Sequence, residues 1–330
     1  MVMVSVRKML SQTRNWDAIK MLFNESPRWL SANLSIPPGA VVDLLYPPPP
    51  LPALESLRLQ TKQRWAQQAY NGPDISLWCP RLTSLSLVGI PPTCMSVPWN
   101  SLSHVSVQMY DNVPTLSQDY ALRYLASLEP TVLQTLSFSS LYRREHPLSI
   151  GERITFPFVD TLRTFNPTIL NNIVLPALRD VHIGPPEHGR GTPGRRYSTA
   201  LLPALDDMLR HSRCFDGITR LVLEYAIPNQ ALIDMLVSLP NLACLVLTFG
   251  DSWSAEMEAT MAMLVKMLDM GFVGRLEELE MRNTFEVRYL GEELVHMAER
   301  RWGFWGGVRL RRLRLGAAGI QECQCAGCVV

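Results

Sequence analysis

The stretch Leu239-Pro-Asn-Leu242-Ala-Cys-Leu245-Val-Leu247 carries the pattern that decides the fold. From Leu242 onward it reads apolar, two variable residues, apolar, one variable residue, apolar. Because alternate residues of a β-strand face the same side, the last two leucines point inward together. Pro240 fixes its own φ and biases the residue before it towards extended geometry, so a turn leads into the strand.

The same pattern recurs along the chain, and a Leu-Pro or Cys-Pro turn precedes several of the copies. The ten copies, of which the fifth is weaker, begin at Leu54, Leu82, Leu102, Leu133, Val159, Leu178, Ile218, Leu242, Leu276 and Leu310. Helix-like stretches lie between them at residues 119–128, 199–211, 230–239, 255–270 and 291–301. A strand and a helix that repeat in this way predict a leucine-rich-repeat solenoid.

The expected fold class is therefore α/β, with a parallel concave sheet and helices on the convex side. Copies are unevenly spaced, and Ile90, Ala226 and Gly250 stand where Asn or Cys usually follows the last leucine of a copy. These departures predict an irregular horseshoe. We expect an N-terminal helical or capping segment at residues 1–50, the solenoid at 51–315, and a flexible cysteine-containing tail at 316–330.

Composition favours a soluble protein of the cytoplasm or nucleus. Apolar residues make up 47% and charged residues 18% of the chain, and the net charge is +1. Such a chain is not built for bulk attraction to nucleic acid or to an anionic membrane, so we expect neither as a partner. It contains no apolar run long enough to span a membrane and no secretory signal. Seven cysteines without an export signal indicate reduced thiols.

One part of the sequence resembles a known family. Four segments carry the likeness, and in order they are MLFNESPRWLSANLSIPPGAVVDLL (21–45), LPALESLRL (51–59), CPRLTSLSLVGI (79–90) and VPWNSLSHVSV (97–107). A helix, an "RW" strand, an "IPP" turn and a first repeat of this kind occur in the same order in mushroom-type fungal F-box/leucine-rich-repeat proteins. Beyond residue 105 the likeness becomes that of a generic leucine-rich repeat.

The resemblance implies the substrate-recognition region of a cullin–RING (SCF-type) ubiquitin ligase subunit, with no enzyme activity of its own. In family members an F-box precedes this region and docks a Skp-type adaptor. Here twenty residues precede Met21, and they lack the LP-x-E-[IL] opening of an F-box. We therefore expect Skp-type adaptor and cullin as partners only if an F-box is present. A stand-alone leucine-rich-repeat scaffold without a ligase role is the alternative.

Variable positions of the strands face the concave side, where they are expected to bind a target protein. The middle strands place Arg179, Asp180, His182 and Arg220 there, and we interpret these four as the partner-binding residues. The last two strands put three glutamates (277, 278 and 280) beside three arginines (311, 312 and 314). Matched register favours pairing between these strands over a separate binding patch.

Motifs of catalysis are weak in this sequence. Residues 189–194 match G-x-G-x-x-G, but the prolines around them and the long basic loop favour an insertion over a nucleotide site. Cys323, Cys325 and Cys328 lack a fourth ligand for a zinc site. We expect no catalytic residue, cofactor or metal. A third alternative is an enzyme whose pocket is formed by insertions at residues 141–156 and 184–198.

Overall fold

The protein is described by a computed structural model in which the placed residues form two compact units, Met1–Val159 and Asp160–Val330. The described residues are 2–6, 25–35, 51–61, 75–76, 78–92, 96–109, 124–125, 127, 131–140, 153–184, 195–226, 229–249, 255–270, 273–282, 296–297, 299–300 and 310–316. Both units are built on parallel strands, and the α-helices α4 (Pro167–Asn172) to α7 (Ala255–Asp269) of the described chain lie in the second unit.

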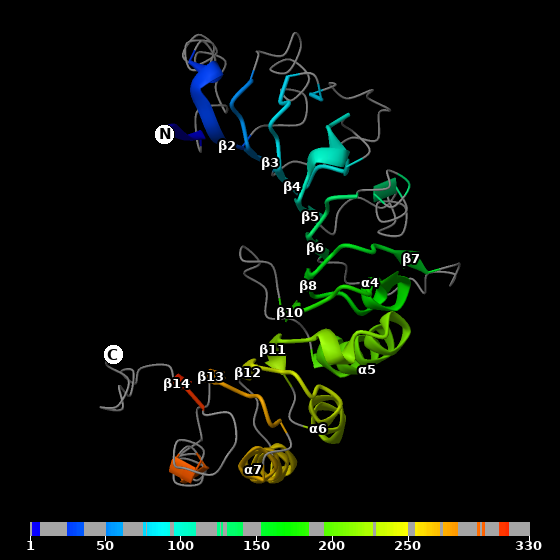
Figure 1. Ribbon diagram of the computed structural model, residues 1–330, viewed down its shortest axis with the longest axis vertical. Coiled ribbons are helices and arrows are strands. Elements are labelled where there is room, and N and C mark those ends of the chain that lie inside the picture. Colours follow the sequence, from blue (N-terminus) through cyan, green and yellow to red (C-terminus); the bar gives the residue numbers. More distant parts are fainter. Residues whose placement is uncertain are drawn as a thin grey trace. The chain divides into compact units, whose positions relative to one another are not determined.

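The first unit contains strands that lie side by side in sequence order, each parallel to the next (Figure 1). They are β1 (Val2–Val6), β2 (Trp29–Ser35), β3 (Ser56–Gln60), β4 (Ser84–Val88), β5 (His104–Met109) and β6 (Thr135–Ser140). Short elements η3 (Ser26–Arg28), η5 (Trp99–Ser101) and β7 (Ile154–Thr155) complete the described part of this unit. Two strands of the sheet thus come from the expected capping segment, residues 1–50.

Register in this sheet follows the sequence pattern. Leu57, Leu85, Val105 and Leu136 are opposite one another on consecutive strands, and all are buried. The first apolar residue of each of these copies is buried as well. The predicted strand positions and the inward direction of the apolar residues are therefore confirmed here.

Turns before the strands also follow the prediction. The backbone N–H of Leu82 donates to the Cys79 carbonyl at 3.1 Å, and that of Leu242 donates to the Leu239 carbonyl at 3.3 Å. Proline stands at the second position of both turns, where its fixed φ is favourable. Equivalent turns start the strands at the same position along the strand direction, so equivalent residues of neighbouring strands are opposite one another.

The second unit repeats the arrangement with longer helices. Its sheet orders β8 (Thr161–Thr164), β10 (Asp180–Ile183), β11 (Arg220–Ala226), β12 (Cys244–Phe249), β13 (Glu278–Arg282) and β14 (Arg312–Gly316), all parallel. The other elements are α4 (Pro167–Asn172), β9 (Ile173–Val174), α5 (Arg195–Ser212), η6 (Phe215–Gly217), α6 (Gln230–Val237) and α7 (Ala255–Asp269). Helices α5, α6 and α7 lie on one side of the strands (Figure 1).

The core of this unit lies between the sheet and these helices. Leu221, Leu245 and Leu279 stand in one register row and are at most 1% exposed. From α7 the apolar face of Met261, Leu264, Val265 and Leu268 is buried, as its helical spacing predicts. The interior therefore belongs to the apolar positions of the repeat, which leaves the variable positions to the other face of the sheet.

One predicted boundary was wrong. The sequence pattern placed an insertion at residues 184–198, but α5 begins at Arg195 and takes in Arg195 and Arg196. Arginine has a high helix propensity, so the helix extends beyond the amphipathic stretch from which it was predicted. Residues 185–194 lie outside the described part of the chain, as do 141–152 of the other insertion.

Candidate functional site

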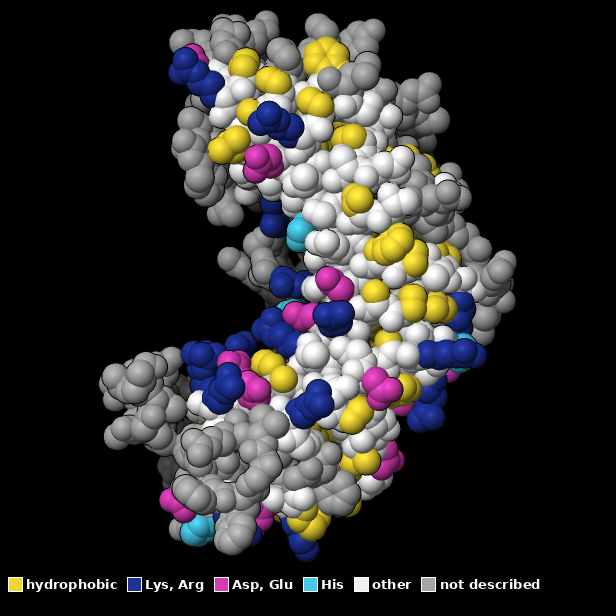
Figure 2. Space-filling model, in the orientation of Figure 1, with side chains coloured by type: hydrophobic (Ala, Val, Ile, Leu, Met, Phe, Trp, Pro, Cys, Tyr) yellow, Lys and Arg dark blue, Asp and Glu magenta, His cyan; other side chains and the backbone are white. Residues whose placement is uncertain are grey.

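A charged face covers the sheet of the second unit on the side opposite the leucines. We use this name for the outward-facing residues Asp180, His182, Arg220, Val222, Cys244, Val246, Glu278, Glu280, Arg312 and Arg314. Acidic and basic side chains are interspersed over this part of the molecule (Figure 2). Strand register decides which of them meet.

Two of the predicted binding residues pair with each other. Asp180 and Arg220 are register partners on β10 and β11, and Arg220 Nη1 donates to Asp180 Oδ2 at 3.3 Å. The arginine side chain is 49% exposed and the aspartate 27%. Because the pair is open to solvent, it contributes about 0–1 kcal/mol to stability and leaves both groups accessible to a ligand.

The third predicted residue has a partner that sequence reasoning missed. His182 Nε2 lies 3.0 Å from Glu224 Oε1, and the two side chains are about three-quarters buried. Glu224 follows the last apolar residue of its copy and extends over the end of β10. A Cβ at Gly184 would lie 2.7 Å from Glu224 Cδ, so the glycine leaves the room in which this carboxylate sits. The sequence could have indicated Glu224, because it is the next outward-facing residue of the strand after Val222 and lies just beyond the repeat pattern.

Arg179 does not join this network. Its backbone carbonyl accepts hydrogen bonds from the N–H groups of Thr219 and Arg220, at 2.9 and 3.1 Å. Its exposed side chain has no ion-pair partner among the described residues. Instead it lines a groove at the amino-terminal ends of the strands. The structure thus joins three of the four predicted residues to the charged face and separates the Arg179 guanidinium from them.

Pairing between β13 and β14 is confirmed at two positions. Glu277 Oε2 lies 3.3 Å from Arg311 Nη1, and Glu278 Oε1 lies 3.2 Å from Arg312 Nη1. Both pairs join register neighbours or the residues just before them, which is what adjacent parallel strands of opposite charge allow. These four side chains are therefore partly neutralised by each other.

The third expected pair does not form. Glu280 Oε1 instead accepts from Arg282 Nε at 2.7 Å, and this bond raises the pKa of the Arg282 guanidinium. Arg282 is two residues further along the same strand and so lies on the same face as Glu280. Arg314 remains exposed and has no ion-pair partner in the described part of the chain.

Two valines form the centre of the charged face. Val222 and Val246 are register partners on β11 and β12, and they are only 7% and 5% exposed although they occupy outward positions. His182 flanks them from β10 and Glu280 from β13. The face therefore has an apolar centre surrounded by polar and charged side chains, a composition found in protein interfaces.

Cys244 sits in the charged row between Arg220 and Glu278. Its Sγ donates to Glu278 Oε2 at 3.8 Å. Burial raises the pKa of this thiol, the Glu278 carboxylate adds to the rise, and the Arg220 guanidinium opposes it. The thiol is thus held protonated and acts as a weak hydrogen-bond donor within the face.

In the first unit the corresponding face is mostly uncharged. Ser31, Ser56, Ser84, His104 and Thr135 form one register row. The row two residues further along the strands contains Arg58, Ser86, Ser106 and Ser137. Hydroxyl side chains therefore predominate on this face of the first unit, and Arg58 lies among them.

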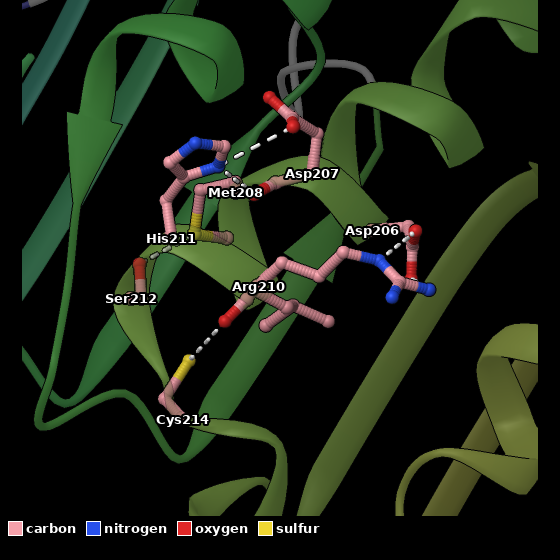
Figure 3. A network of polar contacts seen from close by, with 8 residues as sticks. Asp206, Asp207, Met208, Arg210, His211, Ser212 and Cys214 are labelled. Carbon is pink, nitrogen blue, oxygen red and sulfur yellow. Dashed lines mark hydrogen bonds and ion pairs between the residues drawn. The ribbon is translucent and has the colours of Figure 1, made fainter.

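A second polar cluster closes the end of α5 (Figure 3). Arg210 Nε donates to Asp206 Oδ2 at 2.7 Å, and His211 Nδ1 lies 3.3 Å from Asp207 Oδ1 and 2.8 Å from the Asp207 carbonyl oxygen. Both pairs join residues one helical turn apart, the spacing at which side chains of a helix meet. The cluster also includes Cys214, which raises the question of a Cys-His nucleophilic site.

The thiol of Cys214 is unsuited to that chemistry. It is 3% exposed, and burial raises its pKa to about 11. Its Sγ donates to the Leu209 carbonyl at 4.0 Å. A nucleophilic cysteine needs an accessible thiolate near neutral pH, so we interpret this cluster as the end of a helix.

Other predicted motifs fall elsewhere. The glycine motif at 189–194 and the three cysteines at 323, 325 and 328 lie outside the described residues. Within the described ranges no three His, Cys, Asp or Glu side chains gather as metal ligands. Of the helices that are described, none is both long and apolar enough to cross a membrane.

Comparison with models of known protein families gave no match, and comparison with curated proteins gave none either.

Proposed function

We propose that this protein is a leucine-rich-repeat solenoid that binds a partner protein on the polar face of its sheet. Regular register carries the proposal: each strand presents its variable residues at the same height as its neighbours, so side chains distant in sequence form one continuous surface. No step of bond chemistry is assigned to it. The protein acts by holding its partner.

The charged face is the best-defined part of this surface. Its two central valines are already buried, so the polar and charged side chains around them provide the surface that a partner would contact. The surrounding ion pairs are partly exposed to solvent and suit charged groups that set orientation and association rate. Asp180, His182 and Arg220 therefore remain our partner-binding residues, with Glu224 added through its contact with His182.

The family resemblance gives this binding a context. Residues 21–98 are similar to F-box/leucine-rich-repeat proteins, so we propose that the bound partner is a ubiquitination target. The solenoid would raise the target's effective concentration beside a ubiquitin-loaded enzyme. The cytoplasm and nucleus are the compartments in which such a ligase works, and Skp-type adaptor with cullin would be the connecting partners.

Affinity purification from the native cells tests both target binding on the charged face and the ligase context. We would compare the unaltered protein with Arg220→Glu, which reverses a charge on the proposed face. Arg210→Glu is the matched control: it reverses an exposed, ion-paired arginine on α5. We expect Arg220→Glu to lose target proteins that Arg210→Glu retains. Identical sets of captured proteins for both variants would contradict binding at this face.

Adaptor and cullin answer the separate question of ligase context. If they co-purify with the unaltered protein and with both variants, the ligase context stands, because neither substitution alters residues 21–45. If targets are captured without adaptor and cullin, the protein is a stand-alone scaffold, the alternative weighed above.

A further inference from the structure

A second candidate site lies at the amino-terminal ends of β10 to β13. It is an open groove of about 430 Å³, lined by Arg179, Asp216, Gly217, Thr219, Asn241, Ala243, Arg275 and Glu277. These residues come from the turns before the strands and from the residues that immediately precede or begin each strand. The valine centre of the charged face is not among the residues that line it.

Short side chains form the floor of the groove. Thr219 and Ala243 stand between Arg179 on one side and Glu277 on the other, as shown by the backbone bonds that link these four residues in series. Gly217 brings its turn close to the preceding one, since a Cβ there would lie 2.9 Å from the Leu178 carbonyl oxygen. Small residues between long ones leave a depression along the edge of the sheet.

The charged side chains that line the groove differ in whether they have an ion-pair partner. Glu277 is neutralised by Arg311 at 3.3 Å. The two other cationic side chains, Arg179 and Arg275, are exposed and have no ion-pair partner among the residues that the structure describes. Asn241 Nδ2 donates to the Asp216 backbone carbonyl at 2.8 Å, and this bond links the turns before β11 and β12. Two arginines therefore line one open depression, and neither has an ion-pair partner among the described residues.

We propose that this groove binds carboxylate side chains of an acidic peptide segment, with Arg179 and Arg275 as the two cationic ligands. Guanidinium groups bind carboxylates through two parallel hydrogen bonds, which makes arginine the side chain suited to this recognition. The inference rests on the proposed function, because the peptide would belong to the bound partner. It adds a site outside the charged face and names the chemistry of the segment that fills it.

A peptide suits the groove better than nucleic acid does. The acidic residue Asp216 is one of the residues that line it, and the whole chain carries a net charge of only +1. A phosphate backbone would demand a denser positive surface. An acidic residue flanked by neutral ones can reach the arginines and avoid the aspartate. Removing the charge of Asp216 should therefore strengthen binding.

Fluorescence anisotropy with a labelled peptide tests the site. The probe is a short peptide that alternates glutamate and glycine, and the control peptide has glutamine in place of glutamate. At low salt we expect the glutamate peptide to bind at least about tenfold more tightly than the glutamine peptide, since hydrogen bonds to charged groups are the strong ones. Circular dichroism of each variant confirms that it is folded.

Variants locate the binding. Arg179→Ala with Arg275→Ala should weaken binding of the glutamate peptide about tenfold, and Asp216→Asn should strengthen it a few-fold. Arg81→Ala is the matched control, because Arg81 is exposed and precedes Leu82 as Arg275 precedes Leu276. It should bind as the unaltered protein does. Equal affinities for the two peptides, or an unchanged affinity in the double variant, would overturn the proposal.

The outcome is separable from that of the proposed function. If Arg220→Glu loses its target proteins while the glutamate peptide binds equally to the double variant and the unaltered protein, only the groove assignment fails. If the peptide binds as expected and Arg220→Glu captures the same proteins as Arg210→Glu, the charged-face assignment fails and the groove remains.

Discussion

Replacing Leu245 with alanine should destabilise the second unit by about 3 kcal/mol, within the ~2–5 kcal/mol range for buried leucines. Leu245 is fully buried, and its register neighbours Leu221 and Leu279 are at most 1% exposed. Backbone bonds to strands on both sides hold β12 in place, so the sheet cannot collapse into the space left behind. A cavity term therefore adds to the lost transfer energy.

Urea unfolding followed by circular dichroism measures this effect. With a slope of about 3 kcal/mol per molar, the loss corresponds to a midpoint about 1 M lower. Val237→Ala is the control, because Val237 is 44% exposed on α6 and should change stability by no more than about 0.5 kcal/mol. An unchanged midpoint for Leu245→Ala would refute the inward direction of this residue.

Three further outcomes follow from single contacts. Gly217→Ala should cost about 1–3 kcal/mol, since its Cβ would crowd a backbone oxygen; an unchanged urea midpoint would contradict this. Burial raises the pKa of Cys214 from 9.0 to about 11, so stability should fall as pH rises from 9 to 11, and Cys214→Ala should flatten that fall in urea titrations. A double-mutant cycle on Asp180 and Arg220 should give a coupling of about 0–1 kcal/mol that salt weakens, and a larger, salt-insensitive value would argue against an exposed pair.

The sign of the Cys214 effect follows from its neutral form. Below the ordinary thiol pKa of 9.0 the residue is protonated in both the folded and unfolded states. Between 9 and 11 the unfolded chain loses this proton more readily than the folded one, so unfolding is favoured. Stability contributed by the buried thiol is thus complete below pH 9 and lost as pH rises through the folded pKa.

Strand positions were predictable because the repeat fixes two things at once. A proline turn sets where each strand begins, and alternation sets which residues point inward; both operate within nine residues of sequence, as in the segment from Leu239 to Leu247. Neighbouring copies then meet in register because their turns are equivalent. This local information was sufficient for the strands at Leu57, Leu85, Leu221 and Leu245.

Pairing on the charged face was less predictable. The repeat pattern predicts which face a variable side chain is on, but a long charged side chain can reach several neighbours on that face. Glu280 bonds to Arg282 of its own strand, although Arg314 is its register partner. Likewise His182 reaches Glu224, which lies beyond the repeat pattern. Such choices depend on rotamers and local crowding, which the pattern does not encode.

The repeat accounts for only part of the groove, namely Arg179, Thr219, Ala243 and Glu277, which occupy equivalent positions of successive copies. The rest of its lining, including Asp216, Asn241 and Arg275, comes from the turns before the strands. Gly217 matters only because a particular carbonyl lies opposite it. Turn residues of different copies come together through the strands between them, and that juxtaposition exists only in the folded chain.

Site-specific photo-crosslinking tests the central claim most directly. A benzophenone amino acid placed at Arg163, an exposed residue of β8 beside His182, would report contacts of the proposed face. The same group at Val237 on α6 would report contacts of the helical side. The account predicts that a discrete crosslinked protein forms in cells from position 163 and not from position 237. The same crosslinked protein from both positions, or one from position 237 alone, would contradict partner binding on the polar face of the sheet.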